Sequence, residues 1–127
     1  MKKKILVVDD EPQIVRLLSL RLKAKNFNVL SAYDGHQCVQ VAKVEIPDMI
    51  LLDIKMPLGG GIIAFEKLKS LSETTNIPVI FITAFPSAEI KKQVMDMGAE
   101  DFISKPFKSD VLIDKVNAIL KERESIK

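Results

Sequence analysis

The sequence lacks several features that mark extracellular, membrane-spanning or nucleic-acid-binding proteins. It has one cysteine, Cys38, so no internal disulfide can form and a reducing compartment is favoured. Its apolar runs fall far short of the roughly 20 residues that span a bilayer, and the first of them ends at Asp9 and Asp10, unlike a signal peptide. The 19 basic and 17 acidic residues nearly balance, which argues against nucleic acid or a membrane as the main partner. We therefore expect a cytoplasmic protein.

The length and composition predict one compact domain over residues 1–127. Apolar residues make up 47% of the chain, which is enough for a sizeable core and argues against disorder. A domain of this size buries roughly two thirds of its unfolded surface, so it needs no disulfide to fold. No repeat, low-complexity stretch or linker is visible. The lysines at positions 2–4 are interpreted as solvated residues before a strand rather than as a patch for an anionic surface.

Short apolar runs alternate with longer segments of helical periodicity. The runs predict buried strands at Ile5–Val8, Phe27–Ser31, Met49–Leu52, Val79–Thr83 and Asp101–Ser104. The longer segments predict helices whose inner faces carry Ile14, Leu17, Leu18 and Leu22; Cys38, Val41 and Ala42; Ile62, Phe65 and Leu68; Ile90, Val94 and Met97; and Leu112, Val116, Ile119 and Leu120. The positions of proline and glycine agree with these elements. Pro12 lies in a predicted first turn, Gly98 at a predicted helix end, and Pro47 and Pro78 just before predicted strands. Five strand–helix units predict an α/β fold with a parallel sheet covered on both faces.

Polar residues follow four of the predicted strands. The first strand ends at Asp9, Asp10 and Glu11, the third at Asp53, the fourth at Thr83, and the fifth just before Lys105. Ligands of open parallel sheets bind beyond the carboxyl ends of the strands, so these side chains should gather at one edge. Closely packed carboxylates repel one another, and a hard cation such as Mg²⁺ relieves that repulsion. Asp10 and Asp53 are candidate direct ligands, and Asp9 is a candidate for contact through water.

This set of residues suits the transfer of a phosphoryl group to an aspartate. A metal would screen Asp53 so that an anionic phosphoryl donor can approach, and an aspartate nucleophile gives an acyl phosphate. Lys105 can supply a point charge on a flexible stem, and Thr83 can donate a hydrogen bond to a phosphoryl oxygen. Singly, each residue has a simpler interpretation as a cap, turn, strand or loop residue. Their joint placement at four strand ends favours the functional interpretation.

Four motifs resemble those of bacterial response-regulator receiver domains. They are Val8-Asp9-Asp10-Glu11, Leu52-Asp53-Ile54-Lys55-Met56-Pro57 with Gly61, Ile82-Thr83-Ala84, and Lys105-Pro106-Phe107. The resemblance extends from Ile5 to about Leu120. It implies a flavodoxin-like (βα)5 fold, which is a doubly wound parallel five-stranded sheet in the order 2-1-3-4-5.

The resemblance assigns a role to each matching residue. It implies that Asp53 is the phosphoacceptor and that Asp9 and Asp10 form the acidic metal pair. Together with Asp53 and the backbone carbonyl of Lys55, this pair would hold Mg²⁺. The remaining assignments are Thr83 and Lys105 as phosphoryl-binding residues, Thr83 and Phe102 as the switch pair, and Pro106 as the residue after a cis peptide bond.

The resemblance also implies partners. A sensor histidine kinase or a phosphotransfer protein would donate the phosphoryl group. The chain would be no conventional enzyme, although it would catalyse its own phosphorylation and slow dephosphorylation. The face of the fourth helix, fifth strand and fifth helix would act on a downstream output protein, a fused output domain or, in a phosphorylation-dependent homodimer, a second copy. No direct nucleic-acid or membrane contact is expected, and whether the chain stands alone or is part of a longer protein stays open.

The sequence departs from the usual receiver pattern in places. The loop Leu58-Gly59-Gly60-Gly61 has glycine where the family usually has an apolar and an acidic residue, so a more mobile loop is expected. Phe102 replaces the commoner tyrosine and has no hydroxyl to bond. Lys55 and Phe85, two residues after Asp53 and Thr83, flank the approach of water in the family. Because neither can orient a water as a base, slow self-dephosphorylation is expected.

Other functions fit the same fold class less well. A flavin- or nucleotide-binding module would carry a hydroxyl- and glycine-rich phosphate loop where this chain has Asp9-Asp10-Glu11-Pro12. A phosphatase with an aspartyl nucleophile usually has a second aspartate where this chain has Lys55. A degenerate receiver would lack part of the site, yet all of its polar residues are present. His36 is interpreted as a solvated helix residue, and the relay histidine is expected on the partner.

Overall fold

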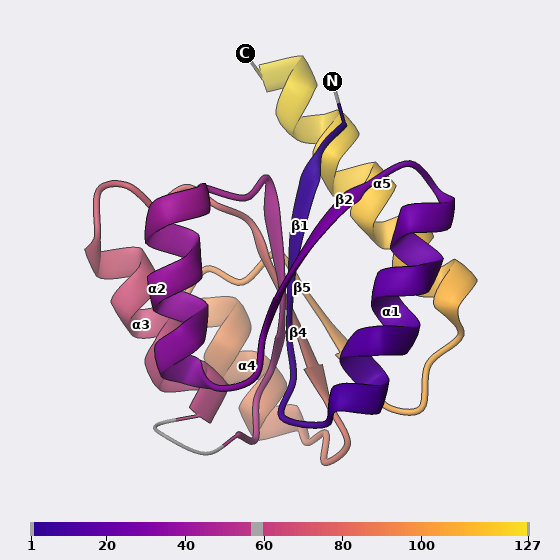
Figure 1. The fold of residues 1–127 in the computed structure, drawn as a ribbon. Helices are drawn as coiled ribbons and strands as arrows, with labels where there is room; N and C mark the ends of the chain where they lie inside the picture. Colours follow the sequence, from indigo (N-terminus) through magenta and orange to yellow (C-terminus); the bar gives the residue numbers. More distant parts are fainter. Residues whose placement is uncertain (1, 57–59, 127) are drawn as a thin grey trace.

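The structure is a five-stranded parallel sheet with helices on both faces (Figure 1). The computed structural model describes residues 2–56 and 60–126, within which five strands and five helices alternate. In chain order they are β1 (Lys4–Val8), α1 (Pro12–Ala24), β2 (Asn28–Ala32), α2 (Gly35–Glu45), β3 (Met49–Asp53), α3 (Gly60–Ser70), β4 (Val79–Thr83), α4 (Ala88–Asp96), β5 (Asp101–Ser104) and α5 (Ser109–Ile126). The strand order β2-β1-β3-β4-β5 confirms the expected fold. Among the described residues, no helix is both long and apolar enough to cross a membrane.

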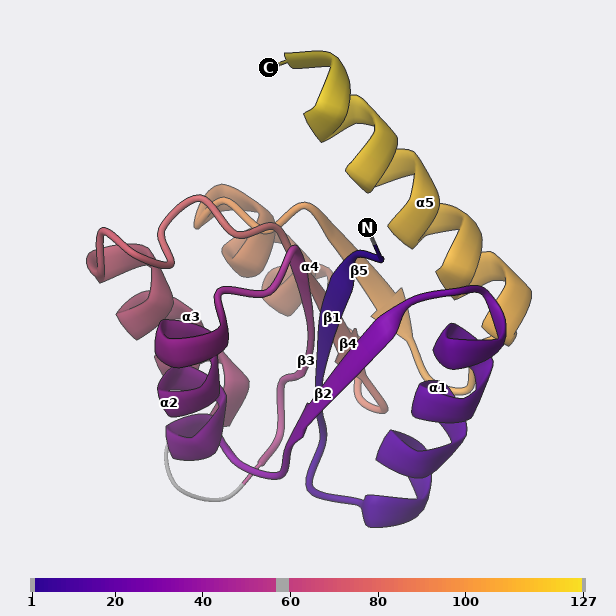
Figure 2. The same ribbon diagram turned by 45° about the horizontal axis from the view of Figure 1, so that its top comes forward.

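The sheet separates two apolar cores. Because successive strand residues point to opposite faces, Leu6 and Val8 pack with α2, α3 and α4, whereas Ile5 and Val7 pack with α1 and α5. All residues of β3 and β4 are buried, which explains why these central strands appear in the sequence as continuous apolar runs. Figure 2 shows α1 and α5 on one side of the sheet and α2 and α3 on the other.

The strand predictions hold to within one residue at each end, but the inner face of α1 was predicted wrongly in part. Leu17 was placed on the buried face, and its exposed fraction is 48%. Val15, Leu18 and Leu22 are the buried residues of this helix. Their spacing of three and four residues keeps them on one side of a helix with 3.6 residues per turn, and Leu17 falls beside that stripe.

Glycine allows the first turn of α3 to lie directly on the end of β3. The amide of Gly61 donates a hydrogen bond of 2.8 Å to the carbonyl oxygen of Ile54. A Cβ atom on Gly61 would lie 2.1 Å from the carbonyl oxygen of Asp53, so no larger residue fits without a shift of the backbone. The expected mobility of the glycine-rich loop stays a prediction, because residues 57–59 lie outside the described residues and Gly60 and Gly61 belong to α3.

Replacing Gly61 with alanine should therefore destabilise the fold and displace Asp53. Overpacking against backbone should lower the free energy of unfolding by at least about 2 kcal/mol. The amide chemical shifts of Asp53 and Ile54 should also change. Denaturant unfolding and NMR spectra of Gly61→Ala would measure the two effects.

Gly98→Ala is the matched control, since Gly98 follows the end of α4 with a φ of +106° and a Cβ there would meet no described atom within 4 Å. That change should cost only backbone strain of about 1–2 kcal/mol and leave the Asp53 signal in place. Unchanged stability and unchanged shifts in Gly61→Ala would contradict the close approach.

Candidate functional site

The predicted site residues meet at the carboxyl edge of the sheet. Val8 of β1 is paired with Leu52 of β3, so Asp9 follows β1 at the level where Asp53 ends β3. On the other side of β3, Asp53 is paired with Ile82, and Thr83 follows as the last residue of β4. The parallel register thus brings together residues that are far apart in the sequence.

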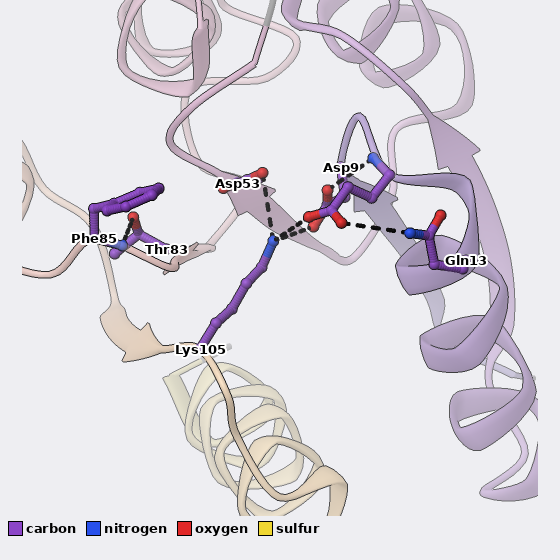
Figure 3. A network of polar contacts seen from close by, with 7 residues as sticks. Asp9, Gln13, Asp53, Thr83, Phe85 and Lys105 are labelled. Carbon is purple, nitrogen blue, oxygen red and sulfur yellow. Dashed lines mark hydrogen bonds and ion pairs between the residues drawn. The ribbon is translucent and has the colours of Figure 1, made fainter.

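Lys105 is the centre of an ionic network at this edge (Figure 3). Its Nζ lies 2.7 Å from Oδ2 of Asp9, 3.5 Å from Oδ2 of Asp53 and 3.8 Å from Oε1 of Glu11. The side chains of Asp9 and Asp53 are only 3% and 7% exposed, so water solvates their negative charges poorly. The backbone amide of Lys105 donates to the carbonyl of Thr83 at 2.7 Å, and the Lys105–Pro106 peptide bond is cis.

The surroundings of Asp53 stabilise its neutral form relative to the same carboxyl group in water. Burial, and next the charge of Asp9, raise the pKa of Asp53 to about 6, although Lys105 opposes the rise. Burial alone would lower the pKa of Lys105, but its hydrogen bond to Asp9 and the charge of Asp53 outweigh burial and raise that pKa. Such close groups titrate as a set. The ammonium therefore does not fully compensate the carboxylates, and an added cation would stabilise them.

The carboxylates of Asp9, Asp10 and Asp53 suit a small hard cation. Each residue offers one oxygen, and these oxygens lie within 4.8 Å of one another. Asp10 is exposed, whereas the other two are buried, so a metal held here would keep contact with water. Oxygen ligands and retained water are what Mg²⁺ prefers. The donor set therefore fits the expected metal, and the carbonyl of Lys55 stays a predicted ligand.

Thr83, Phe85 and Lys55 border Asp53 on the side of β4. Thr83 is 1% exposed, and its Oγ1 accepts a hydrogen bond of 3.1 Å from the amide of Phe85. A hydroxyl that accepts in this way keeps its own hydrogen for another acceptor. Phe85 is 62% exposed, and the Nζ of Lys55 lies 4.4 Å from the centroid of its ring. This cation–π contact ties together the two flanking side chains that the sequence singled out.

Two further predicted residues lie away from the carboxylates. Phe102 on β5 is paired with Phe81 on β4 and packs half-buried against the core that faces α2, α3 and α4. Its role as a switch residue stays a prediction. His36 lies exposed in the first turn of α2, in accord with its interpretation as a solvated residue.

Sequence reasoning missed a cavity beside Lys105. It has a volume of about 570 Å³, and it is lined by Ile14, Leu17, Leu18, Ala84, Phe85, Lys105, Pro106, Phe107 and Ser109. The signal in the sequence was Leu17 itself, because a leucine outside the inward stripe of α1 leaves apolar surface uncovered. The cavity therefore offers a largely apolar contact surface beside Lys105.

The raised pKa of Asp53 predicts a pH-dependent gain in stability for Asp53→Asn without metal. The pKa rises from an ordinary 3.8 to about 6 on folding, so the wild type loses stability as the pH rises from about 4 to about 6. At pH 7 the variant should gain at most about 3 kcal/mol, because one pKa unit corresponds to about 1.4 kcal/mol. Below about pH 4 the gain should vanish.

Denaturant unfolding in a metal-free buffer between pH 3.5 and about 7.5 would measure this difference. Asp114→Asn, at an exposed position on α5, is the control for removing a carboxylate outside the site. A difference between Asp53→Asn and the wild type that stays constant over this range would contradict the assignment.

Comparisons with known proteins agree with the resemblance to receiver domains. The family model of the response regulator receiver domain matches residues 5–117. The DNA-binding dual master transcriptional regulator RpaA of Synechocystis is 33% identical over 123 residues. The match covers 97% of this chain and 51% of RpaA, so the chain spans about half the length of this curated relative.

Solved structures agree with these matches. A CheY-like response regulator receiver domain protein from Methanospirillum hungatei superimposes with a TM-score of 0.94 and 27% identity, over 100% of both chains. The receiver domain of the Francisella response regulator 1452 gives a TM-score of 0.89 and 30% identity, over 96% of this chain and 99% of that one. This chain belongs to the response regulator receiver domain family.

Proposed function

We propose that residues 1–127 form one phosphoacceptor domain of a two-component system, in which Asp53 takes a phosphoryl group from a phosphohistidine. The donor is a sensor histidine kinase or a phosphotransfer protein, and the reaction depends on Mg²⁺. The observation that carries the proposal is the buried Asp53 carboxylate, 3.5 Å from the Lys105 ammonium and clustered with Asp9 and Asp10. The chain catalyses its own phosphorylation and slow dephosphorylation and is not a conventional enzyme.

The transfer is a substitution at phosphorus. An oxygen of Asp53 forms the new phosphorus–oxygen bond, and the phosphorus–nitrogen bond of the phosphohistidine breaks as the imidazole leaves with its electron pair. Asp9, Asp10, Asp53 and the carbonyl of Lys55 would hold Mg²⁺, which when bound supplies positive charge for the phosphoryl oxygens. Lys105 adds a fixed positive charge, and the hydroxyl of Thr83 donates a hydrogen bond to the phosphoryl group.

The signal then passes through Thr83 and Phe102. When the Thr83 hydroxyl turns toward the phosphoryl oxygens, it vacates space beside β4. The ring of Phe102, already half-buried, moves into that space. The face of α4, β5 and α5 changes shape as a result and acts on a downstream output protein, a fused output domain or a second phosphorylated copy. The domain itself makes no contact with nucleic acid or a membrane and works in the cytoplasm.

Direct labelling tests the proposal. Acetyl phosphate should phosphorylate the protein at Asp53 alone, and only when Mg²⁺ is present. Phosphate-affinity gels and intact mass measurement would follow the reaction. Asp53→Asn should abolish labelling, whereas Asp48→Asn, which changes a carboxylate at the opposite edge of the sheet, should retain it. Labelling of Asp53→Asn at near-normal stoichiometry would sink the assignment.

The contact between Lys55 and Phe85 predicts a long-lived phosphoryl group. Both side chains flank the path of a water toward the phosphorus, and their cation–π contact holds them together. Replacing both, in Lys55→Asn with Phe85→Glu, should remove the shield and provide a carboxylate that can orient water. We expect the half-life to shorten about tenfold or more, in line with the contribution of a positioned base.

The half-life is measured in excess Mg²⁺ after the donor is removed. Each single substitution serves as a control and should show a smaller effect, because each leaves one flanking side chain in place. If the double variant keeps its phosphoryl group as long as the wild type does, these residues do not set the rate.

A further inference from the structure

Two consecutive carboxylates at the start of β5 are paired with two cations of α5. Asp101 Oδ2 lies 2.8 Å from the Nζ of Lys115, and Glu100 forms an ion pair with the guanidinium of Arg123. Lys115 and Arg123 are about two helical turns apart, or roughly 12 Å along the helix axis. The four side chains are between 30% and 39% exposed. The strand is therefore fastened to the helix at two separate points.

Asp101 connects this fastening to the proposed switch residue. Its Oδ1 accepts a hydrogen bond of 2.8 Å from the backbone amide of Phe102, while its Oδ2 binds Lys115. One carboxylate thus bridges the backbone of Phe102 and an ammonium of α5. A movement of Phe102 that shifts its amide must either break this bridge or carry Lys115 with it.

Arg123 reaches the beginnings of both β4 and β5. Besides Glu100, its guanidinium donates a hydrogen bond of 2.7 Å to the carbonyl of Asn76, three residues before β4. The amide of Glu100 in turn donates to the carbonyl of Val79, the first residue of β4, at 2.9 Å. The last turn of α5 is therefore tied to the strands that carry Thr83 and Phe102.

The apolar core that holds α5 does not include Phe102. Leu112, Ile113, Val116 and Leu120 pack in the core shared with α1. Phe102 packs against the other core, on the opposite face of the sheet, so these apolar contacts do not join it directly to the helix. Charged hydrogen bonds are directional and fix which turn lies beside which strand residue.

We propose that the Glu100–Arg123 and Asp101–Lys115 pairs form an ionic latch that makes β5 and α5 respond to phosphorylation as one body. The inference rests on the proposed function, because it needs a change at Phe102 to transmit. With the latch intact, the change at β5 reaches the last turns of α5. When the Glu100–Arg123 pair is removed, the change at β5 no longer reaches the last turns of α5.

Hydrogen exchange on the full chain, with and without Mg²⁺ and beryllium trifluoride as a phosphoryl mimic, tests the latch. In the wild type the exchange rates of residues 101–104 and of residues 117–125 should both change at least about twofold. In Arg123→Gln and in Glu100→Gln the first change should persist and the second should disappear. Without the mimic, the exchange rates of residues 117–125 should be about two- to fivefold higher in these two variants than in the wild type. This is the range expected from the loss of one partly exposed ion pair.

Three further variants separate coupling from a loss of packing. Lys115→Gln combined with Arg123→Gln should lose the response along the whole of α5. Arg123→Lys keeps a cationic donor at this position and should retain the α5 response that Arg123→Gln loses. Lys92→Gln is the matched control, since its 2.8 Å ion pair with Asp96 lies within α4.

The outcomes are distinct. A wild-type response in α5 of Arg123→Gln, or loss of the response in Arg123→Lys, would overturn the latch. A wild type whose β5 does not respond to the mimic would overturn the proposed function, and the latch with it. Loss of the α5 response in Lys92→Gln would show that any surface charge matters, which also excludes the latch.

Discussion

The parallel register of the sheet is the constraint on which the site depends. Because β1, β3 and β4 run in the same direction and pair residue against residue, Asp9, Asp53 and Thr83 reach the same edge. Central strands that are buried on both faces cannot slip in register without exposing apolar side chains. The stability of the core therefore also fixes the positions of the polar groups at the edge, and Gly61 allows α3 to begin directly against Asp53.

A charge imbalance at that edge makes the site suitable for chemistry. Lys105 contacts Asp9 closely and Asp53 less closely, so part of the negative charge stays without a partner in a poorly solvated place. Such an arrangement costs folding free energy, as the raised pKa of Asp53 indicates. It also leaves the carboxylates suited to a cation, which would supply the missing positive charge and screen Asp53 from an anionic donor. The repulsion among these carboxylates and their proposed reactivity thus have one electrostatic cause.

The opposite edge of the sheet links the strands to α5. Arg123 binds Glu100 and the carbonyl of Asn76, far from Asp53 along the strands. Strands are stiff along their length, so a displacement that begins at Thr83 or Phe102 can be transmitted to the first residues of β4 and β5. In this arrangement the proposed phosphoryl chemistry and the proposed ionic latch lie toward opposite ends of the strands.

The sequence by itself determined the fold class, the strand positions to within a residue, and the candidate site, because burial on both faces and the carboxyl-edge rule leave their mark in local patterns. Tertiary structure decided the rest. Leu17 follows a helical spacing yet lies outside the inward stripe, since only packing against the sheet selects which side of α1 is buried. The pairing of Lys105 with Asp9, and of Arg123 with Glu100, joins residues that are 96 and 23 positions apart. Such contacts depend on where whole elements come to lie, and no local pattern of residues encodes that.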